Sequence, residues 1–225
     1  MVIEGRNLSL VYDRNKEEET HALRDVSITI AAGECTAVVG PSGSGKSSLL
    51  YLISGLRKPS AGTVYFDDED IEAYTSEQRD QIRRERFGFI FQKRFLIDYM
   101  TVMENILAVP DKNNEALRER AFDLLGQLGI RHLAAKKPFQ LSGGQRQRVA
   151  VVRALINCPD VIFADEPTAS VDYANAHEII SILRNQGDRN TPQNAASVII
   201  VTHDRSILGG MDRIIEMRDG KILSY

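Results

Sequence analysis

The stretch CTAVVGPSGSGKSSLLYLISGL, residues 35–56, decides the fold. Its first part is a short apolar run that stops at Gly40, which is typical of a buried strand. Its last part, from Lys46 to Gly55, carries apolar residues at helical spacing and ends near a glycine, as helices commonly do. We therefore expect a strand, a tight loop and a helix, the beginning of an α/β domain.

The loop between the strand and the helix matches G-x-x-x-x-G-K-[ST] at every fixed position. Glycines let backbone N–H groups turn toward phosphate, and the helix N-terminus adds unpaired donors and a favourable dipole. We expect Lys46 to reach the β- and γ-phosphates of ATP and the Ser47 hydroxyl to bind Mg²⁺. A plain glycine-rich turn is the weaker alternative. The predicted nucleotide-binding residues here are Gly40, Pro41, Ser42, Gly43, Ser44, Gly45, Lys46, Ser47 and Ser48.

Further strands and helices flank this loop. Alternating or apolar runs predict strands at NLSLVY (7–12), DVSITI (25–30), GTVYFDD (62–68), FGFIFQ (87–92), DVIFADE (160–166) and SVIIVTH (197–203). Helical spacing predicts helices at TSEQRDQIRRER (75–86), NEALRERAFDLLGQLG (114–129), GGQRQRVAVVRALI (143–156) and ANAHEIISILRNQ (174–186). No strand signal occurs from Lys93 to Ile156, which predicts a helical subdomain. The polar stretches 13–20 and 185–197 are expected to be surface loops, the first of them mobile.

Composition narrows the class of partner. The chain has 225 residues and a formal net charge of -3, so nucleic acid is not the expected partner. Cys35 and Cys158 have no metal-ligand spacing and are expected to be reduced thiols in or near the core of a cytoplasmic protein. The start lacks a basic segment followed by an apolar run, and no stretch is long and apolar enough to span a bilayer. Membrane contact is therefore expected only through a partner.

An acidic pair follows one of the apolar strands. Asp165 and Glu166 stand at its end, where water and a metal ion can reach them. Asp165 suits the metal-holding acid of phosphate-loop NTPases, and Glu166 suits the general base that polarises the attacking water. An acidic pair at a strand end is common by chance. Downstream of a complete phosphate loop, however, the pair favours the metal-binding and general-base roles.

A second glycine-rich motif, LSGGQ, begins at Leu141 and precedes a predicted helix. Ser142 lies near the helix N-terminus, where it can cap unpaired N–H groups, and the glycines allow close approach to phosphate. A capped helix with no ligand is the simpler interpretation for an isolated S-G-G. Since one nucleotide needs one phosphate loop, a second such motif requires a different surface, ligand or subunit.

Taken together, GPSGSGKS, LSGGQ, the acidic pair and VTHD resemble the nucleotide-binding subunit of an ABC (ATP-binding cassette) transporter, from end to end of the chain. The resemblance implies one domain over residues 1–225: a P-loop NTPase (RecA-like) core with an N-terminal antiparallel β subdomain in 1–92 and 157–225, and an inserted helical signature subdomain in 93–156. It also implies head-to-tail pairing, with Ser142, Gly143, Gly144 and Gln145 of one subunit closing on the γ-phosphate held by another.

The same resemblance assigns four single residues. Tyr12 matches the aromatic residue that stacks on adenine, and Gln92 matches the glutamine that meets Mg²⁺ and water and senses the membrane partner. Asp172 matches the aspartate of a loop that communicates across the dimer, although it also suits a helix cap. His203 matches the histidine that contacts the γ-phosphate. Without the resemblance, each would be interpreted as structural.

The implied function is that of an Mg²⁺-dependent ATPase that homodimerises around two ATP molecules and drives a separate transmembrane permease from the cytoplasmic face of the membrane. ALRDVS, GFIFQ and QLSGGQRQRVAVVRAL are similar to the lipoprotein-release, macrolide-efflux and cell-division group, so we expect export, lipoprotein release or force transmission. A polar amino-acid importer subunit and a soluble ABC scaffold are alternatives. A small nucleotide kinase leaves LSGGQ unexplained. KRFLIDYM, residues 93–100, departs from that group where the partner should bind.

Overall fold

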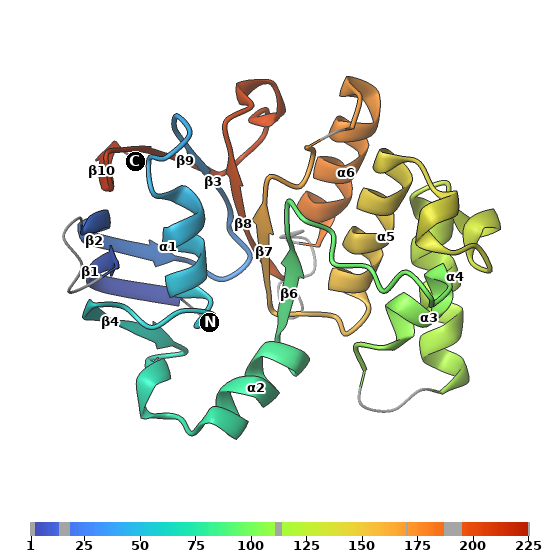
Figure 1. The fold of residues 1–225 in the computed structure, drawn as a ribbon, viewed down its shortest axis with the longest axis horizontal. Coiled ribbons are helices and arrows are strands. Elements are labelled where there is room, and N and C mark those ends of the chain that lie inside the picture. The colour runs from blue at the N-terminus through green and yellow to red at the C-terminus, as the bar shows by residue number, and fades with distance from the viewer. Residues whose placement is uncertain (1–2, 14–18, 111–113, 170, 187–194, 225) are drawn as a thin grey trace.

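The computed structural model describes residues 3–13, 19–110, 114–169, 171–186 and 195–224. Most of each predicted surface loop, residues 14–18 and 187–194, lies outside the described residues. The chain forms two sheets flanked by helices (Figure 1). The strands of the first sheet stand in the order β2-β1-β4-β5, and those of the second in the order β10-β9-β3-β8-β7-β6.

The first sheet is antiparallel and comes mostly from the N-terminal part of the chain. Alternation of apolar and polar residues in β1 and β2 buries one face, as expected for a half-covered antiparallel sheet. Its strands are β1 (Ile3–Tyr12), β2 (Thr20–Ile30), β4 (Ala61–Phe66) and β5 (Glu69–Asp70).

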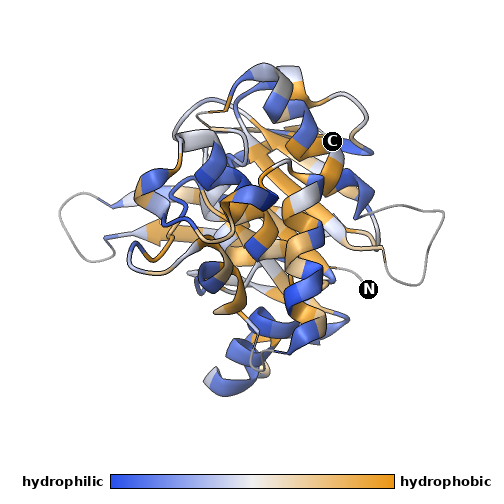
Figure 2. Ribbon diagram, turned by 90° about the vertical axis from the view of Figure 1, so that its right-hand side faces the viewer, coloured by the Kyte–Doolittle hydropathy of each residue, from blue (hydrophilic) through white to orange (hydrophobic). Residues whose placement is uncertain are grey.

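The second sheet is parallel except for its last strand, which pairs antiparallel with β9. Its strands are β3 (Cys35–Val39), β6 (Phe87–Ile90), β7 (Val161–Asp165), β8 (Ser197–Thr202), β9 (Arg213–Arg218) and β10 (Lys221–Ser224). Successive residues of a strand point to opposite faces. Accordingly, Phe163 of β7 belongs to one hydrophobic core and its neighbour Ile162 to the other. Figure 2 shows that the strands in the interior of the molecule are largely hydrophobic.

Helices cover both faces of this sheet. Helix α1 (Lys46–Ile53) packs into the core shared with the antiparallel sheet. On the other face lie α5 (Gly143–Leu155) and α6 (Tyr173–Asn185), with α3 (Val102–Leu107) and α4 (Glu115–Gln127) beyond them (Figure 1). Helix α2 (Ser76–Glu85) leads into β6. Short 3-10 turns occupy Ile71–Ala73, Arg131–Leu133, Pro138–Gln140 and Arg205–Ile207. The predicted α/β phosphate-loop fold is confirmed.

Three details differ from the sequence expectation. Strand β6 ends at Ile90, not at Gln92, because it is an edge strand whose pairing with β7 stops at Ile90 and Ala164. The hairpin of β9 and β10 was not predicted. Cys35 is buried, but Cys158 is exposed, so the expectation that both thiols lie in or near the core is wrong for Cys158. Among the described residues, no helix combines the length and the apolar character needed to cross a membrane.

Candidate nucleotide-binding site

The glycine-rich loop after β3 is folded tightly against two other strands. A Cβ on Gly40 would lie 2.1 Å from the Met217 carbonyl oxygen, and a Cβ on Gly45 would lie 2.5 Å from that of Ala22. Gly45 also has a φ of 98°, which side chains rarely adopt. Both positions therefore require glycine, and they turn the loop around a pocket of about 620 Å³.

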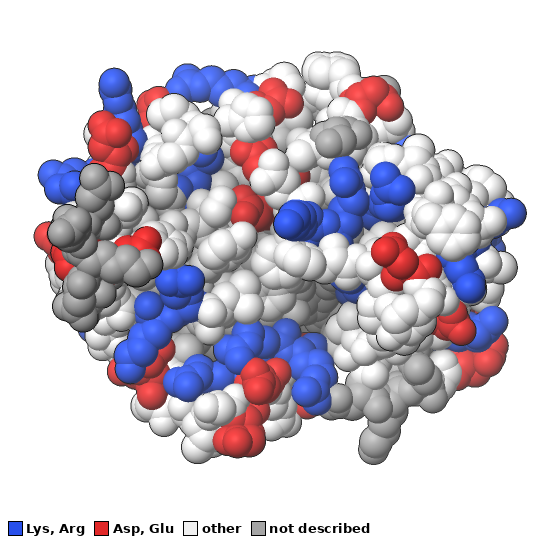
Figure 3. Space-filling view, in the orientation of Figure 1, with Lys and Arg blue, Asp and Glu red and all other residues white. Residues whose placement is uncertain are grey.

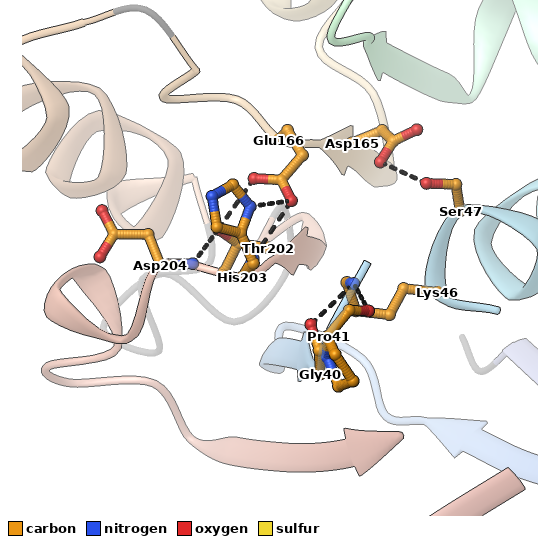
Figure 4. Close-up of polar contacts among 9 residues, drawn as sticks. All are labelled: Gly40, Pro41, Lys46, Ser47, Asp165, Glu166, Thr202, His203 and Asp204. Carbon is orange, nitrogen blue, oxygen red and sulfur yellow. Dashed lines mark hydrogen bonds and ion pairs between the residues drawn. The ribbon is translucent and has the colours of Figure 1, made fainter. Parts of the chain in front are cut away.

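Lys46 lies at the first turn of α1 and points into this loop (Figure 4). Its Nζ donates to the carbonyl oxygens of Gly40 and Pro41, each at 2.9 Å. Burial lowers the pKa of Lys46, and the nearby carboxylates of Glu166 and Asp165 partly offset that shift. The amine is thus held at the pocket by weak carbonyl acceptors, and a phosphate oxygen would be a stronger partner.

Ser47, which lines the pocket, is hydrogen-bonded to the buried Asp165. The Ser47 hydroxyl donates to Asp165 Oδ1 at 2.8 Å (Figure 4), and the Tyr51 hydroxyl donates to Asp165 Oδ2 at 3.0 Å. Burial, then the charge of Asp165, raises the pKa of Tyr51 to about 12. Sequence reasoning missed Tyr51, although its position four residues after Ser47 places both on one face of α1.

The Ser47 and Asp165 pair fits Mg²⁺. Magnesium prefers oxygen ligands and usually takes one or two from protein, the rest from phosphates and water. Within the described part of the chain, no cluster of three or more His, Cys, Asp or Glu residues forms a complete metal cage. Ser44 adds a second indication of an incoming ligand, because its Oγ is buried and has no hydrogen-bond partner among the described residues of the protein.

Glu166 directly follows β7 and faces the pocket. Its backbone has a φ of 50°, and its Oε2 accepts a hydrogen bond from the Thr202 hydroxyl at 3.1 Å. Its Oε1 accepts the His203 backbone N–H at 3.1 Å and lies 2.7 Å from His203 Nδ1 (Figure 4). Positive φ is uncommon for residues other than glycine, and such strain clusters at functional sites. Strand β8 therefore fixes the Glu166 carboxylate, and Thr202 was not foreseen in this role.

Tyr12 and Gln92 lie at the rim of the same pocket. The Tyr12 hydroxyl lies 3.2 Å from Ser48 Oγ, and the Arg57 guanidinium covers the Tyr12 ring at 4.6 Å from its centroid. Gln92 is exposed and follows the end of β6 by two residues. The structure thus gathers the predicted adenine-stacking residue, the phosphate loop, Gln92, Glu166 and His203 around one cavity.

The residues of the second glycine-rich motif lie elsewhere. Ser142 caps α5: its Oγ accepts the Gln145 N–H at 3.2 Å, while Gln145 Oε1 accepts the Ser142 N–H at 2.8 Å. Asp172 likewise caps α6, and its hydrogen bonds with Asn175 lower its pKa. Ser142, Gly143, Gly144, Gln145 and Asp172 do not line the pocket of the phosphate loop.

Sequence comparison gives a family and two named relatives. Residues 23–169 match the ABC transporter family. The chain is 41% identical over 214 residues to the macrolide export ATP-binding/permease protein MacB of Pectobacterium atrosepticum, and 43% identical over 212 residues to MacB of a Shewanella species. These matches cover 93% and 92% of this chain but 32% of each relative, so the chain spans about a third of their length.

Structure comparison gives close matches along the whole chain. The dimeric structure of MJ0796, a bacterial ABC transporter cassette, aligns with a TM-score of 0.90 and 35% identity over 99% of this chain and 97% of that one. A dimeric post-hydrolysis state of the same cassette, bound to ADP and Pi, aligns with a TM-score of 0.89 at the same identity and coverage.

Proposed function

Because this chain belongs to the ABC transporter family, we propose that it binds ATP with Mg²⁺, hydrolyses it, and couples both steps to a membrane permease. One observation carries the proposal. Lys46 and Ser47 of the phosphate loop line the same pocket as Glu166 and His203, which come from distant parts of the sequence. Groups for binding phosphate and for activating water therefore face one cavity.

Nucleotide binding follows from the geometry of the loop. The phosphates would replace the Gly40 and Pro41 carbonyl oxygens as acceptors for Lys46 Nζ and would also take the Ser44 hydroxyl. The face of the Tyr12 ring opposite Arg57 would stack on adenine. Ser47 and Asp165 would hold Mg²⁺, with Gln92 as a further ligand; the ion supplies charge stabilisation to the transferring phosphoryl group.

Hydrolysis would depend on Glu166. Each oxygen of a carboxylate can accept two hydrogen bonds; the backbone N–H and Nδ1 of His203 both meet Oε1, whereas the Thr202 hydroxyl leaves acceptor capacity on Oε2. Glu166 can therefore accept a proton from a water molecule held beside the γ-phosphate. His203 would orient this carboxylate through the Nδ1 contact and would present its other ring nitrogen to the γ-phosphate.

The second glycine-rich motif would serve another copy of the chain. The capped N-terminus of α5 carries the favourable dipole for an anion, but it does not line the pocket of its own phosphate loop. We propose that it closes on ATP held by a second copy, and that Asp172 lies at the same contact. The two MJ0796 structures are dimeric cassettes, which supports this arrangement.

The membrane partner is proposed to be a permease of an export system. Both relatives are named macrolide export proteins with an ATP-binding and a permease part, and this favours export over amino-acid import or a scaffold role. The cassette would then act at the cytoplasmic face of the membrane.

The test is phosphate release from ATP by the purified chain, with and without Mg²⁺. We expect hydrolysis that requires Mg²⁺ and that is largely lost in Asp165→Asn, which keeps the volume of the side chain but removes its charge. Asp219→Asn is the matched control, because Asp219 is highly exposed and contacts only Arg218 among the ion pairs of the described chain. Full activity of Asp165→Asn, or no hydrolysis by the unmodified chain, would overturn the proposal.

A further inference from the structure

An arginine lies on the ring of Tyr12, at the rim of the nucleotide pocket. The guanidinium carbon of Arg57 is 4.6 Å from the centroid of that ring, which is within the range of a cation–π contact. Tyr12 lines the pocket, whereas Arg57 is not among the residues that line it. Arg57 therefore contacts the Tyr12 ring from outside the pocket and reaches the proposed nucleotide site only through this ring.

The backbone around Arg57 is tied to both neighbouring elements. Arg57 follows α1, and its backbone N–H donates to the Tyr51 carbonyl oxygen of that helix at 2.9 Å. Three residues later, the Ser60 hydroxyl oxygen accepts the backbone N–H of Val11 at 3.1 Å. Val11 directly precedes Tyr12 in β1. The connection between α1 and β4 is thus fixed to the helix and to the strand that ends at Tyr12.

The side chain of Arg57 has no acidic partner. Within the described part of the chain, its guanidinium forms no ion pair, whereas the neighbouring Lys58 pairs with Glu72 at 3.0 Å. Figure 3 shows Lys and Arg side chains at the surface over the connection between α1 and β4, where Arg57 and Lys58 lie. A guanidinium is planar and weakly hydrated, so it stacks readily on an aromatic face. The Tyr12 ring is therefore the group that holds this guanidinium.

The same contact restrains the tyrosine. Tyr12 is the last residue of β1, and its hydroxyl oxygen lies 3.2 Å from Ser48 Oγ. The hydroxyl contact fixes the far end of the ring, and the Arg57 guanidinium covers one of its two faces. A ring that is already oriented loses less conformational entropy when a ligand stacks on it. A base can then stack on one face of Tyr12, because the other face is occupied.

We propose that Arg57 is a positioning residue for the base of the nucleotide, which it serves by holding the Tyr12 ring in its stacking orientation. This inference rests on the proposed function, since stacking of adenine on Tyr12 is part of it. Arg57 would touch neither the nucleotide nor the attacking water, because it lies behind the ring. A cation–π contact at an exposed site corresponds to a change of about two- to fivefold in affinity. Arg57 should therefore affect ATP binding modestly and hydrolysis of bound ATP not at all.

The experiment is steady-state ATP hydrolysis by Arg57→Gln, which keeps a long polar side chain but removes the cation. We expect the KM for ATP to rise about two- to fivefold while kcat stays unchanged. Arg57→Lys keeps the charge without the planar group, so its KM should lie between those of Arg57→Gln and the unmodified chain. Inhibition by Mg²⁺-tripolyphosphate, which has the phosphates but no base, should be equally strong for all three proteins.

A double-mutant cycle separates positioning from a general structural effect. In the Tyr12→Ala background, Arg57→Gln should leave the KM unchanged, because the ring that Arg57 positions is gone. Arg6→Gln is the matched control: Arg6 lies over the Tyr65 ring at 4.5 Å, and neither residue lines the nucleotide pocket. Its KM and kcat should equal those of the unmodified chain. An unchanged KM in Arg57→Gln, an equal rise of KM in the Tyr12→Ala background, or weaker inhibition by tripolyphosphate would overturn the inference.

The same measurements distinguish failure of the inference from failure of the proposed function. If the unmodified chain hydrolyses ATP and only Tyr12→Ala raises the KM, the role of Arg57 fails and the proposed function stands. If Tyr12→Ala also leaves the KM unchanged, the stacking role of Tyr12 fails together with that of Arg57. If the unmodified chain does not hydrolyse ATP, the proposed function itself fails.

Discussion

The chain carries two glycine-rich helix starts, and they differ in what surrounds them. At α1, strands from distant parts of the sequence surround the loop. They bring Asp165 to Ser47 and place Glu166 and His203 around the pocket that Lys46 lines. At α5, the cap of Ser142 and Gln145 is complete within four residues, and Ser142 is exposed. The first start is one wall of a pocket built within the chain, whereas the second lies at the surface. Similar local motifs therefore acquire different surroundings through the tertiary fold.

The largest expected effect concerns water activation by Glu166, a group found at the pocket of the first helix start and not at the second. Glu166→Gln should keep ATP binding and lower hydrolysis by about 10³-fold, within the range for losing a general base. The measurement is phosphate release under saturating ATP. Glu216→Gln, at an exposed ion pair with Arg205, is the control and should leave the rate unchanged. A fully active Glu166→Gln would assign water activation to another group.

Lys46→Ala should produce the next largest effect, on ATP affinity. A hydrogen bond to a charged group contributes about 1.5–3 kcal/mol, so ATP binding should weaken by roughly 10- to 150-fold. Binding can be followed with a fluorescent ATP analogue. Lys58→Ala is the matched control, since Lys58 is 76% exposed and pairs with Glu72 at the surface. Unchanged ATP affinity in Lys46→Ala would show that the phosphate loop at α1 does not bind ATP through Lys46.

Gly144→Ala tests the second helix start while sparing the fold. A Cβ at Gly144 would meet its nearest heavy atom, Val171 Cγ1, at 4.0 Å, which is ordinary contact. Alanine also favours helix over glycine by up to about 1 kcal/mol, so the midpoint of thermal unfolding should not fall. We expect ATP-dependent association, measured by sedimentation in the Glu166→Gln background, to weaken at least about tenfold. Association as tight as with Gly144 would mean that this surface does not meet the nucleotide.

The smallest expected effect is a pH dependence at the first site. The folded-state pKa of Tyr51 is raised from 10.0 to about 12, so its protonated hydroxyl stabilises the fold fully below pH 10.0. That contribution is lost as the pH rises toward 12. Tyr51→Phe should therefore be less stable than the unmodified chain at pH 9, with a difference that shrinks above pH 10. Urea unfolding at a series of pH values measures it, and a constant difference would contradict the assignment.

The sequence predicted the fold where local pattern and context agree. The apolar run, glycine loop and helix at residues 35–56 defined β3 and α1, and DVIFADE and SVIIVTH defined buried parallel strands. The hairpin of β9 and β10 was missed because charged residues interrupt the apolar pattern of β9 and because β10 has only four residues. Asp219 and Gly220, which form its turn, were an available signal.

The features near the site that the sequence did not predict depend on contacts between residues far apart in the chain. Arg94 Nε donates to Gln147 Oε1 at 3.1 Å and Nη2 donates to the Ala169 carbonyl oxygen at 3.3 Å, which ties the loop after Gln92 to α5 and to the segment after Glu166. Neither spacing nor periodicity marks such a contact. The positive φ of Glu166 and of Phe95 is equally invisible to pattern analysis, because tertiary packing imposes it.

The central claim is that the two helix starts of one chain serve two different nucleotides. The most direct measurement is ATP hydrolysis by mixed variants. In a mixed dimer of Lys46→Ala and Gly144→Ala chains, one intact phosphate loop faces one intact Gly144. In a mixed dimer of the double variant and the unmodified chain, neither nucleotide site has both parts intact. We predict that the first mixture hydrolyses ATP faster than the mean of its separate components. A rate equal to that mean would contradict the claim.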